Sequence, residues 1–184
     1  QPQRSLRATL QQLPEDVRWA LCDIAASDNG VVIAQALRDG TAVAVSDGSF
    51  KDKFGTAAWV IEGRRSDGRL EGQCIIPGGP EDQSAYRSEL GGLYAIAAMV
   101  QVICELHNIQ EGSIEVACDG MNALAQVGEA DPIIRPNGAQ YDIIAATQAK
   151  IKRTNIQWKM RHVMGHQDDT QGCTVMDRWE TLNC

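Results

Sequence analysis

The sequence predicts an α/β fold in which helices pack against one mixed β-sheet. Short apolar runs recur between turn signals, and two long segments carry apolar residues at helical spacing. Three consecutive strands joined by short turns favour antiparallel pairing, and the later strands are separated by helices, which favours parallel crossovers. The 184 residues are enough for one main domain with a sizeable core.

The predicted strands are apolar runs bounded by Gly, Pro, Asn or Asp. Asp67-Gly68, between the second and third runs, is a strong hairpin signal. The fourth run follows the first long helix, and the fifth follows the second long helix. We expect five strands, over residues 41–46, 56–62, 70–77, 113–118 and 155–163.

The strongest helical pattern begins at Ser84 and closes near Asn108, with apolar residues at steps of four and three. Further helices are predicted over residues 122–127, 141–151 and 174–183. The first forty residues are also predicted to be helical, with turns at Asn29-Gly30 and Asp39-Gly40. We therefore expect a helical connection segment over residues 1–40 and the main domain over residues 41–184.

Composition narrows the class of protein. Six cysteines without a C-x-x-C pair favour buried free thiols over disulfides or zinc. No secretion signal and no run of eighteen apolar residues is present, so we expect a soluble, intracellular chain without a membrane partner. There is also no glycine-rich nucleotide-binding run, which disfavours a nucleotide-binding α/β domain.

The net charge of -7 opposes nucleic-acid binding by bulk electrostatics, because phosphates are neutralised by Lys and Arg. The objection weakens if acidic residues hold divalent cations, which invert the local potential. Basic residues also cluster late in the chain and could lie together on one face of the domain: Lys150, Lys152, Arg153, Lys159 and Arg161.

Three carboxylates stand out by their positions. Asp47 follows the first predicted strand, Glu89 borders the buried stripe of the long helix, and Asp119 ends the fourth strand. Each alone is also explained as a turn, flank or capping residue. Together they can converge at one sheet edge, where unpaired carboxylates repel one another and raise each other's pKa. A hard divalent cation such as Mg²⁺ or Mn²⁺ would relieve that repulsion.

The tail adds a polar, glycine-containing turn after the last strand, Arg161-His162-Val163-Met164-Gly165-His166, and then acids. His166 could relay protons or help product leave, since histidine changes charge near neutral pH; a structural loop histidine is the alternative.

At this point the sequence resembles the ribonuclease H family, especially the domain that follows the polymerase in retrotransposon reverse transcriptases. The matching pieces, in the family's order and on its elements, are Ser46-Asp47-Gly48-Ser49, Tyr86-Arg87-Ser88-Glu89-Leu90, Cys118-Asp119 and Val163-Met164-Gly165-His166. The resemblance covers residue 41 to the end and implies a ribonuclease H-like fold, with a five-stranded mixed sheet and helices on both faces.

The resemblance implies endonucleolytic hydrolysis of the RNA strand of RNA–DNA hybrids by two Mg²⁺ or Mn²⁺ ions about 4 Å apart. Asp47, Glu89, Asp119 and a fourth acid would hold the ions, with His166 also catalytic. Contacts to nucleic acid, including the RNA 2′-hydroxyls, would come from Gly48, Ser49 and Asn122 and from around Glu89. The expected partners are the hybrid and a polymerase domain N-terminal in the same polyprotein.

The fourth acid departs from the family pattern, in which it lies about ten residues past the histidine. Met176 occupies that position here, so we assign Asp177, with Asp168 or an acid beyond Cys184 as alternatives. Two other functions stay open: a DNA-cutting nuclease or integrase of the same fold, and a non-catalytic binding or structural module.

Overall fold

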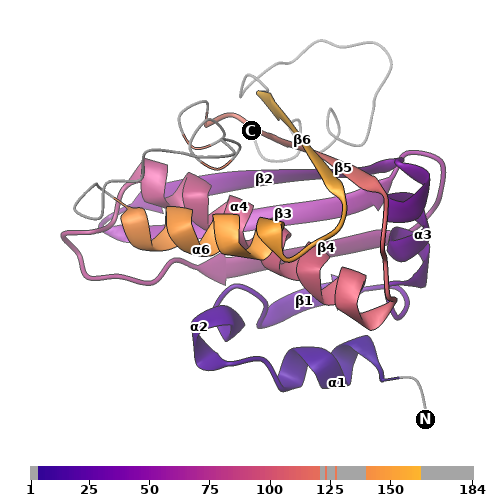
Figure 1. Cartoon of the computed structure of the whole chain (residues 1–184). Coiled ribbons are helices and arrows are strands. Elements are labelled where there is room, and N and C mark those ends of the chain that lie inside the picture. Colours follow the sequence, from indigo (N-terminus) through magenta and orange to yellow (C-terminus); the bar gives the residue numbers. More distant parts are fainter. Residues whose placement is uncertain (1–3, 121–122, 124–126, 128–139, 163–184) are drawn as a thin grey trace.

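A computed structural model describes residues 4–120, 123, 127 and 140–162 of the chain. Its centre is a six-stranded mixed sheet in the order β1-β4-β3-β2-β5-β6 (Figure 1). The strands are β1 (Asp23–Ala26), β2 (Ala42–Lys51), β3 (Phe54–Gly63), β4 (Arg69–Ile75), β5 (Ser113–Cys118) and β6 (Gln157–His162). The helices described in full are α1 (Leu6–Gln11), α2 (Glu15–Arg18), α3 (Val31–Asp39), α4 (Ala85–Leu106) and α6 (Tyr141–Lys152).

The pairing directions confirm the mixed sheet. Strands β1, β4, β3 and β2 pair antiparallel in that spatial order, while β5 runs parallel to both β2 and β6. The prediction of five strands was wrong by one, because β1 from the N-terminal segment adds an edge strand beside β4. That strand has four residues, mostly exposed, and its Ile24 continues the helical spacing of Val17, Ala20 and Leu21, so periodicity indicated a helix instead.

The first strand of the main domain is longer than predicted. β2 continues through Asp47 and Gly48 to Lys51, and the chain reverses at Asp52 and Lys53, which both have positive φ (53° and 64°). Two residues with positive φ make the tight turn that joins twisted antiparallel strands. Asp-Gly-Ser, which resembles a turn, is therefore part of the strand.

The larger of two hydrophobic clusters in the described residues lies between the sheet and α4, and the smaller one consists of Val43, Val45, Val60 and Ala117. The largest fully buried side chains of the larger cluster include Trp59, Ile61 and Leu70 from the sheet and Ile96 and Met99 from α4. Leu6, Val17, Leu21 and four residues of α3 belong to the same core, so the described part of residues 1–40 packs as part of this body. The boundary at residue 40 stays a prediction.

Helix α4 contributes many of the buried side chains of this core. By length and composition it could cross a membrane, with a mean hydropathy of 1.4 over eighteen residues, but 83% of that window is buried inside the domain. Burial on this scale is what a core helix shows. Ser84 begins the helix, its hydroxyl accepting a 3.0 Å hydrogen bond from the Arg87 amide.

Cysteine burial follows the prediction at three positions: Cys74, Cys104 and Cys118 are buried free thiols, whereas Cys22 is exposed. The helix predicted over residues 174–183 lies outside the described residues, so a helix on the sheet's second face stays a prediction. Of the short helix predicted over residues 122–127, Ala123 and Val127 are described, and both are helical and buried.

Candidate active site

Asp47 of β2 and Asp119, the residue directly after β5, lie at the same edge of the sheet. The parallel pairing of β2 with β5 matches Val45 to Ala117, and each aspartate lies two residues farther along the chain. Because parallel neighbours run in the same direction, both carboxylates belong to the end where β2 and β5 finish pairing. Ligand sites of open α/β sheets lie at this kind of position.

Glycine lets the long helix approach this strand closely. A Cβ on Gly48 would lie 2.5 Å from both the Glu89 nitrogen and the Ser88 carbonyl carbon. Gly92 of α4 packs in the same way on Ser46, which a Cβ would approach to 2.9 Å. The first turns of α4 therefore lie directly on β2 and bring Glu89 beside Asp47.

The electrostatics indicate that the three predicted carboxylates lie near one another. Burial raises the pKa of Glu89, and the charges of Asp119 and then Asp47 raise it further. Burial also raises the pKa of the Cys118 thiol to about 12, with contributions from the same three carboxylates. A Cβ on Gly120 would overlap the Glu89 carboxylate, so the segment after Asp119 passes directly beside it.

His162 is a residue near this cluster that sequence reasoning missed. The β5–β6 pairing places it opposite Cys118, and its Nε2 lies 3.0 Å from the backbone carbonyl oxygen of Asp119, to which it donates. The sequence assigned the histidine role to His166, outside the described residues. Aligning the ends of the two predicted parallel strands would have pointed to His162.

The other predicted site residues divide by position. Gly48 and Ser49 lie within β2 and not in a turn after it, and their assignment to nucleic-acid contacts stays a prediction. Asn122, Asp168 and Asp177 lie outside the described residues, together with His166, and their assignments stay predictions. The predicted basic face is partly neutralised, because Arg161 forms a 3.0 Å ion pair with Glu115.

The three carboxylates are suitable ligands for a hard divalent cation, because all their donor atoms are oxygens. Burial and the acidic neighbours also destabilise the charged form of Glu89, which a cation would relieve. Within the described part of the chain, no three His, Cys, Asp or Glu side chains are grouped closely enough to hold a metal ion. Asp47, Glu89 and Asp119 thus fit a metal in charge and donor type, and the fourth predicted ligand falls outside that part.

A cavity of about 570 Å³ opens beside Asp47 and is lined by residues of β2, β3 and β4, by Cys22 and by Asp23 at the start of β1. Ser49, Thr56 and Gln73 contribute polar groups to its wall, and Phe54 and Ile75 are exposed at 53% and 59%. The candidate site is therefore open to solvent on this side.

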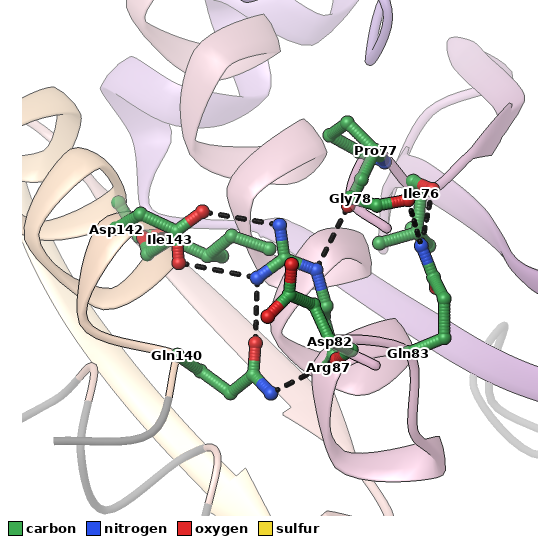
Figure 2. Close-up of polar contacts among 10 residues, drawn as sticks. Ile76, Pro77, Gly78, Asp82, Gln83, Arg87, Gln140, Asp142 and Ile143 are labelled. Carbon is green, nitrogen blue, oxygen red and sulfur yellow. Dashed lines mark hydrogen bonds and ion pairs between the residues drawn. The ribbon is translucent and has the colours of Figure 1, made fainter. Parts of the chain in front are cut away.

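Arg87, two residues before Glu89, joins three segments behind the site (Figure 2). Its Nε donates to the Pro77 carbonyl at 2.8 Å, Nη1 donates to Gln140 at 2.6 Å, and both Nη atoms bind the Asp142 carboxylate at 3.0 and 3.1 Å. The side chain of Arg87 is 6% exposed. This network fixes the first turn of α4 against the first turn of α6.

Replacing Arg87 with methionine should lower the free energy of unfolding by about 2 to 4 kcal/mol, because the buried guanidinium and its hydrogen bonds to Pro77, Gln140 and Asp142 are lost together. Asp142→Asn should cost about 1 kcal/mol or less, since Asp142 is 65% exposed. Urea unfolding measures both.

The Arg87 hydrogen bonds lower the pKa of Asp142. The stability that the Asp142 carboxylate contributes is therefore present above pH 3.8, the ordinary pKa, and is lost as the pH falls below that value. Equal losses from the two variants would contradict this account.

Comparisons with solved structures show a ribonuclease H-like fold. LC11-RNase H1, isolated from compost by a metagenomic approach, matches with a TM-score of 0.52 at 14% identity, over 68% of this chain and 85% of that one. The same protein in complex with an RNA/DNA hybrid matches with a TM-score of 0.54 at 12% identity, over 67% and 85%. The foamy viral protease-reverse transcriptase is more distant, with a TM-score of 0.49 at 15% identity, over 77% and 19%. No protein-family model and no curated protein sequence matches the chain.

Proposed function

We propose that this domain hydrolyses the RNA strand of RNA–DNA hybrids with divalent metal ions held by Asp47, Glu89 and Asp119. The observation that best supports the proposal is that Asp119 and Asp47 lie near enough to Glu89 of α4 to add to the effect of burial in raising its pKa, in a chain with a ribonuclease H-like fold. A neighbour with this fold is known in complex with an RNA/DNA hybrid.

The bound cations supply an activated water and charge stabilisation at the leaving oxygen. The chain's own residues do the positioning. Asp47 and Asp119 present carboxylates from adjacent strands, Glu89 completes the set from α4, and the Gly48–Glu89 contact fixes the distance between strand and helix. We assign recognition of the RNA 2′-hydroxyls to Ser49 and the backbone at Gly48.

The decisive test is cutting of a labelled RNA–DNA hybrid, with duplex RNA and duplex DNA beside it, in Mg²⁺, Mn²⁺ or EDTA. We expect metal-dependent cutting of the hybrid's RNA strand alone. Asp47→Asn should reduce the rate by about 100-fold or more, because a charge that holds the metal is lost. Asp67→Asn, an exposed aspartate in the β3–β4 turn, serves as the matched control and should cut at the wild-type rate.

Two outcomes would replace the proposal. Cutting of duplex DNA would assign the domain to the nucleases and integrases that share this fold. No cutting with either metal, by a chain that unfolds cooperatively, would favour the non-catalytic module.

We also propose that the domain works inside the cell as part of a retroelement reverse transcriptase, joined to an N-terminal polymerase domain. The order of the four matching motifs supports this context. It predicts that the coding sequence upstream encodes a polymerase in the same reading frame, and a different upstream domain would refute it.

A further inference from the structure

Cys22, the residue just before β1, and Cys74 of β4 come from different parts of the chain and lie near the same edge of the sheet. β1 pairs with β4 antiparallel, with Asp23 opposite Gln73 and Ile24 opposite Gly72. Continuing this register by one residue places Cys22 opposite Cys74. Directly opposite residues have Cα atoms about 4.5 to 5.5 Å apart and side chains on one face, within the range of about 4.4 to 6.8 Å that disulfides span.

Two independent observations bring the thiols together. Both cysteines line the 570 Å³ cavity beside Asp47. Burial raises the pKa of Cys74 to about 12, and the neighbouring Cys22 thiol contributes to that increase. Cys22 is exposed and its thiol donates only a 3.5 Å contact to the Trp19 carbonyl, so it is free to turn toward Cys74.

We propose that Cys22 and Cys74 form a reversible disulfide when the protein meets a small-molecule disulfide such as oxidised glutathione. The exposed Cys22 thiolate attacks one glutathione sulfur, forms a mixed disulfide and releases one glutathione thiolate. The Cys74 thiol then attacks the Cys22 sulfur, which forms the Cys22–Cys74 bond and releases the second glutathione, whose sulfur takes up the Cys74 proton. The protein thiols are oxidised and the glutathione disulfide is reduced.

The bond would join the N-terminal edge strand covalently to the sheet that carries Asp47. β1 is a four-residue strand at the sheet edge, next to α1 and α2 (Figure 1). Closing the long loop between the two cysteines removes entropy from the unfolded chain, and we expect Tm to rise by about 5 to 15 °C. This inference goes beyond the proposed nuclease function and does not depend on it.

The test exposes the full chain to a series of oxidised and reduced glutathione mixtures, in a background where Cys173 and Cys184 are serine. We expect the intact mass to fall by two hydrogen atoms. A non-reduced digest should contain the Cys22 and Cys74 peptides linked together. Across the glutathione series, the rise in Tm and the change in mass should have the same midpoint ratio of oxidised to reduced glutathione. Dithiothreitol should reverse both changes.

The matched variants separate this pair from general thiol oxidation. Cys22→Ser, at an exposed position that leaves the core intact, should abolish the link, while Cys104→Ser, which removes another buried thiol, should leave it unchanged. A glutathione adduct that stays on Cys22, a link to a different cysteine, or no change in mass would each overturn the proposal.

Discussion

Replacing Gly48 with alanine should destabilise the domain by about 1 to 3 kcal/mol and reduce hybrid cutting by on the order of 100-fold. The added Cβ would lie 2.5 Å from backbone atoms of both Ser88 and Glu89, and backbone atoms cannot rotate away as a side chain can. The first turns of α4 must therefore move away from β2. That movement separates Glu89 from Asp47, so stability and activity fall for the same reason.

Gly79→Ala is the matched control, because the Cβ there would meet only the flexible carboxylate end of Glu81. Urea unfolding should be nearly unchanged in this variant, and so should hybrid cutting. Activity of Gly48→Ala is measured well below its Tm, so that unfolding does not account for the loss. A folded Gly48→Ala protein with wild-type cutting would show that the strand–helix distance does not set the site.

Local patterns in the sequence were sufficient for most of the sheet and for the places of Asp47 and Asp119. The apolar stripe after Ser84 predicts α4, and the ends of two apolar runs place the two aspartates at the same end of the β2–β5 pair, although β2 itself continues past Asp47. Glu89 follows because its place beside the buried stripe directs it toward that edge. These inferences work because helical and strand periodicities depend on neighbouring residues alone.

The sequence was less informative where conformation depends on distant contacts. The extension of β2 through Asp47 requires its partner β3 and a turn made by Asp52 and Lys53, whose positive φ is uncommon for residues other than glycine. β1 is a strand because β4 offers it a free edge, and its own residues carry little strand signal. Pairing with the sheet overrides local propensity there.

Side-chain partners far apart in the chain are not indicated by local patterns. Arg87 binds Asp142, 55 residues away, and no short-range pattern indicates that pair. His162 reaches the carbonyl oxygen of Asp119 across 43 residues, a contact that can be anticipated only by aligning the ends of two predicted parallel strands. Both contacts depend on how α6 and β6 pack beside the site.

Glu89→Gln should have opposite effects on stability and on function. Burial and the charges of Asp119 and Asp47 raise the pKa of Glu89 in the folded state. A carboxyl with a raised pKa favours folding most at low pH, and this contribution is lost as the pH rises above 4.5, the ordinary glutamate pKa. In EDTA the variant should therefore have a higher Tm than wild type at pH 7, and the difference should shrink as the pH falls toward 4.5.

Adding Mg²⁺ should reverse that order, because a cation bound to the native state stabilises it and binds the wild type more tightly. Cutting by Glu89→Gln should fall by about 100-fold or more. Glu111→Gln, at an exposed glutamate between α4 and β5, should match wild type in both the pH series and the Mg²⁺ series. If Glu89→Gln gained as much Tm from Mg²⁺ as wild type, Glu89 would not be a metal ligand. A variant less stable than wild type in EDTA would mean that the Glu89 carboxylate makes a favourable contact that outweighs the repulsion from its two neighbours.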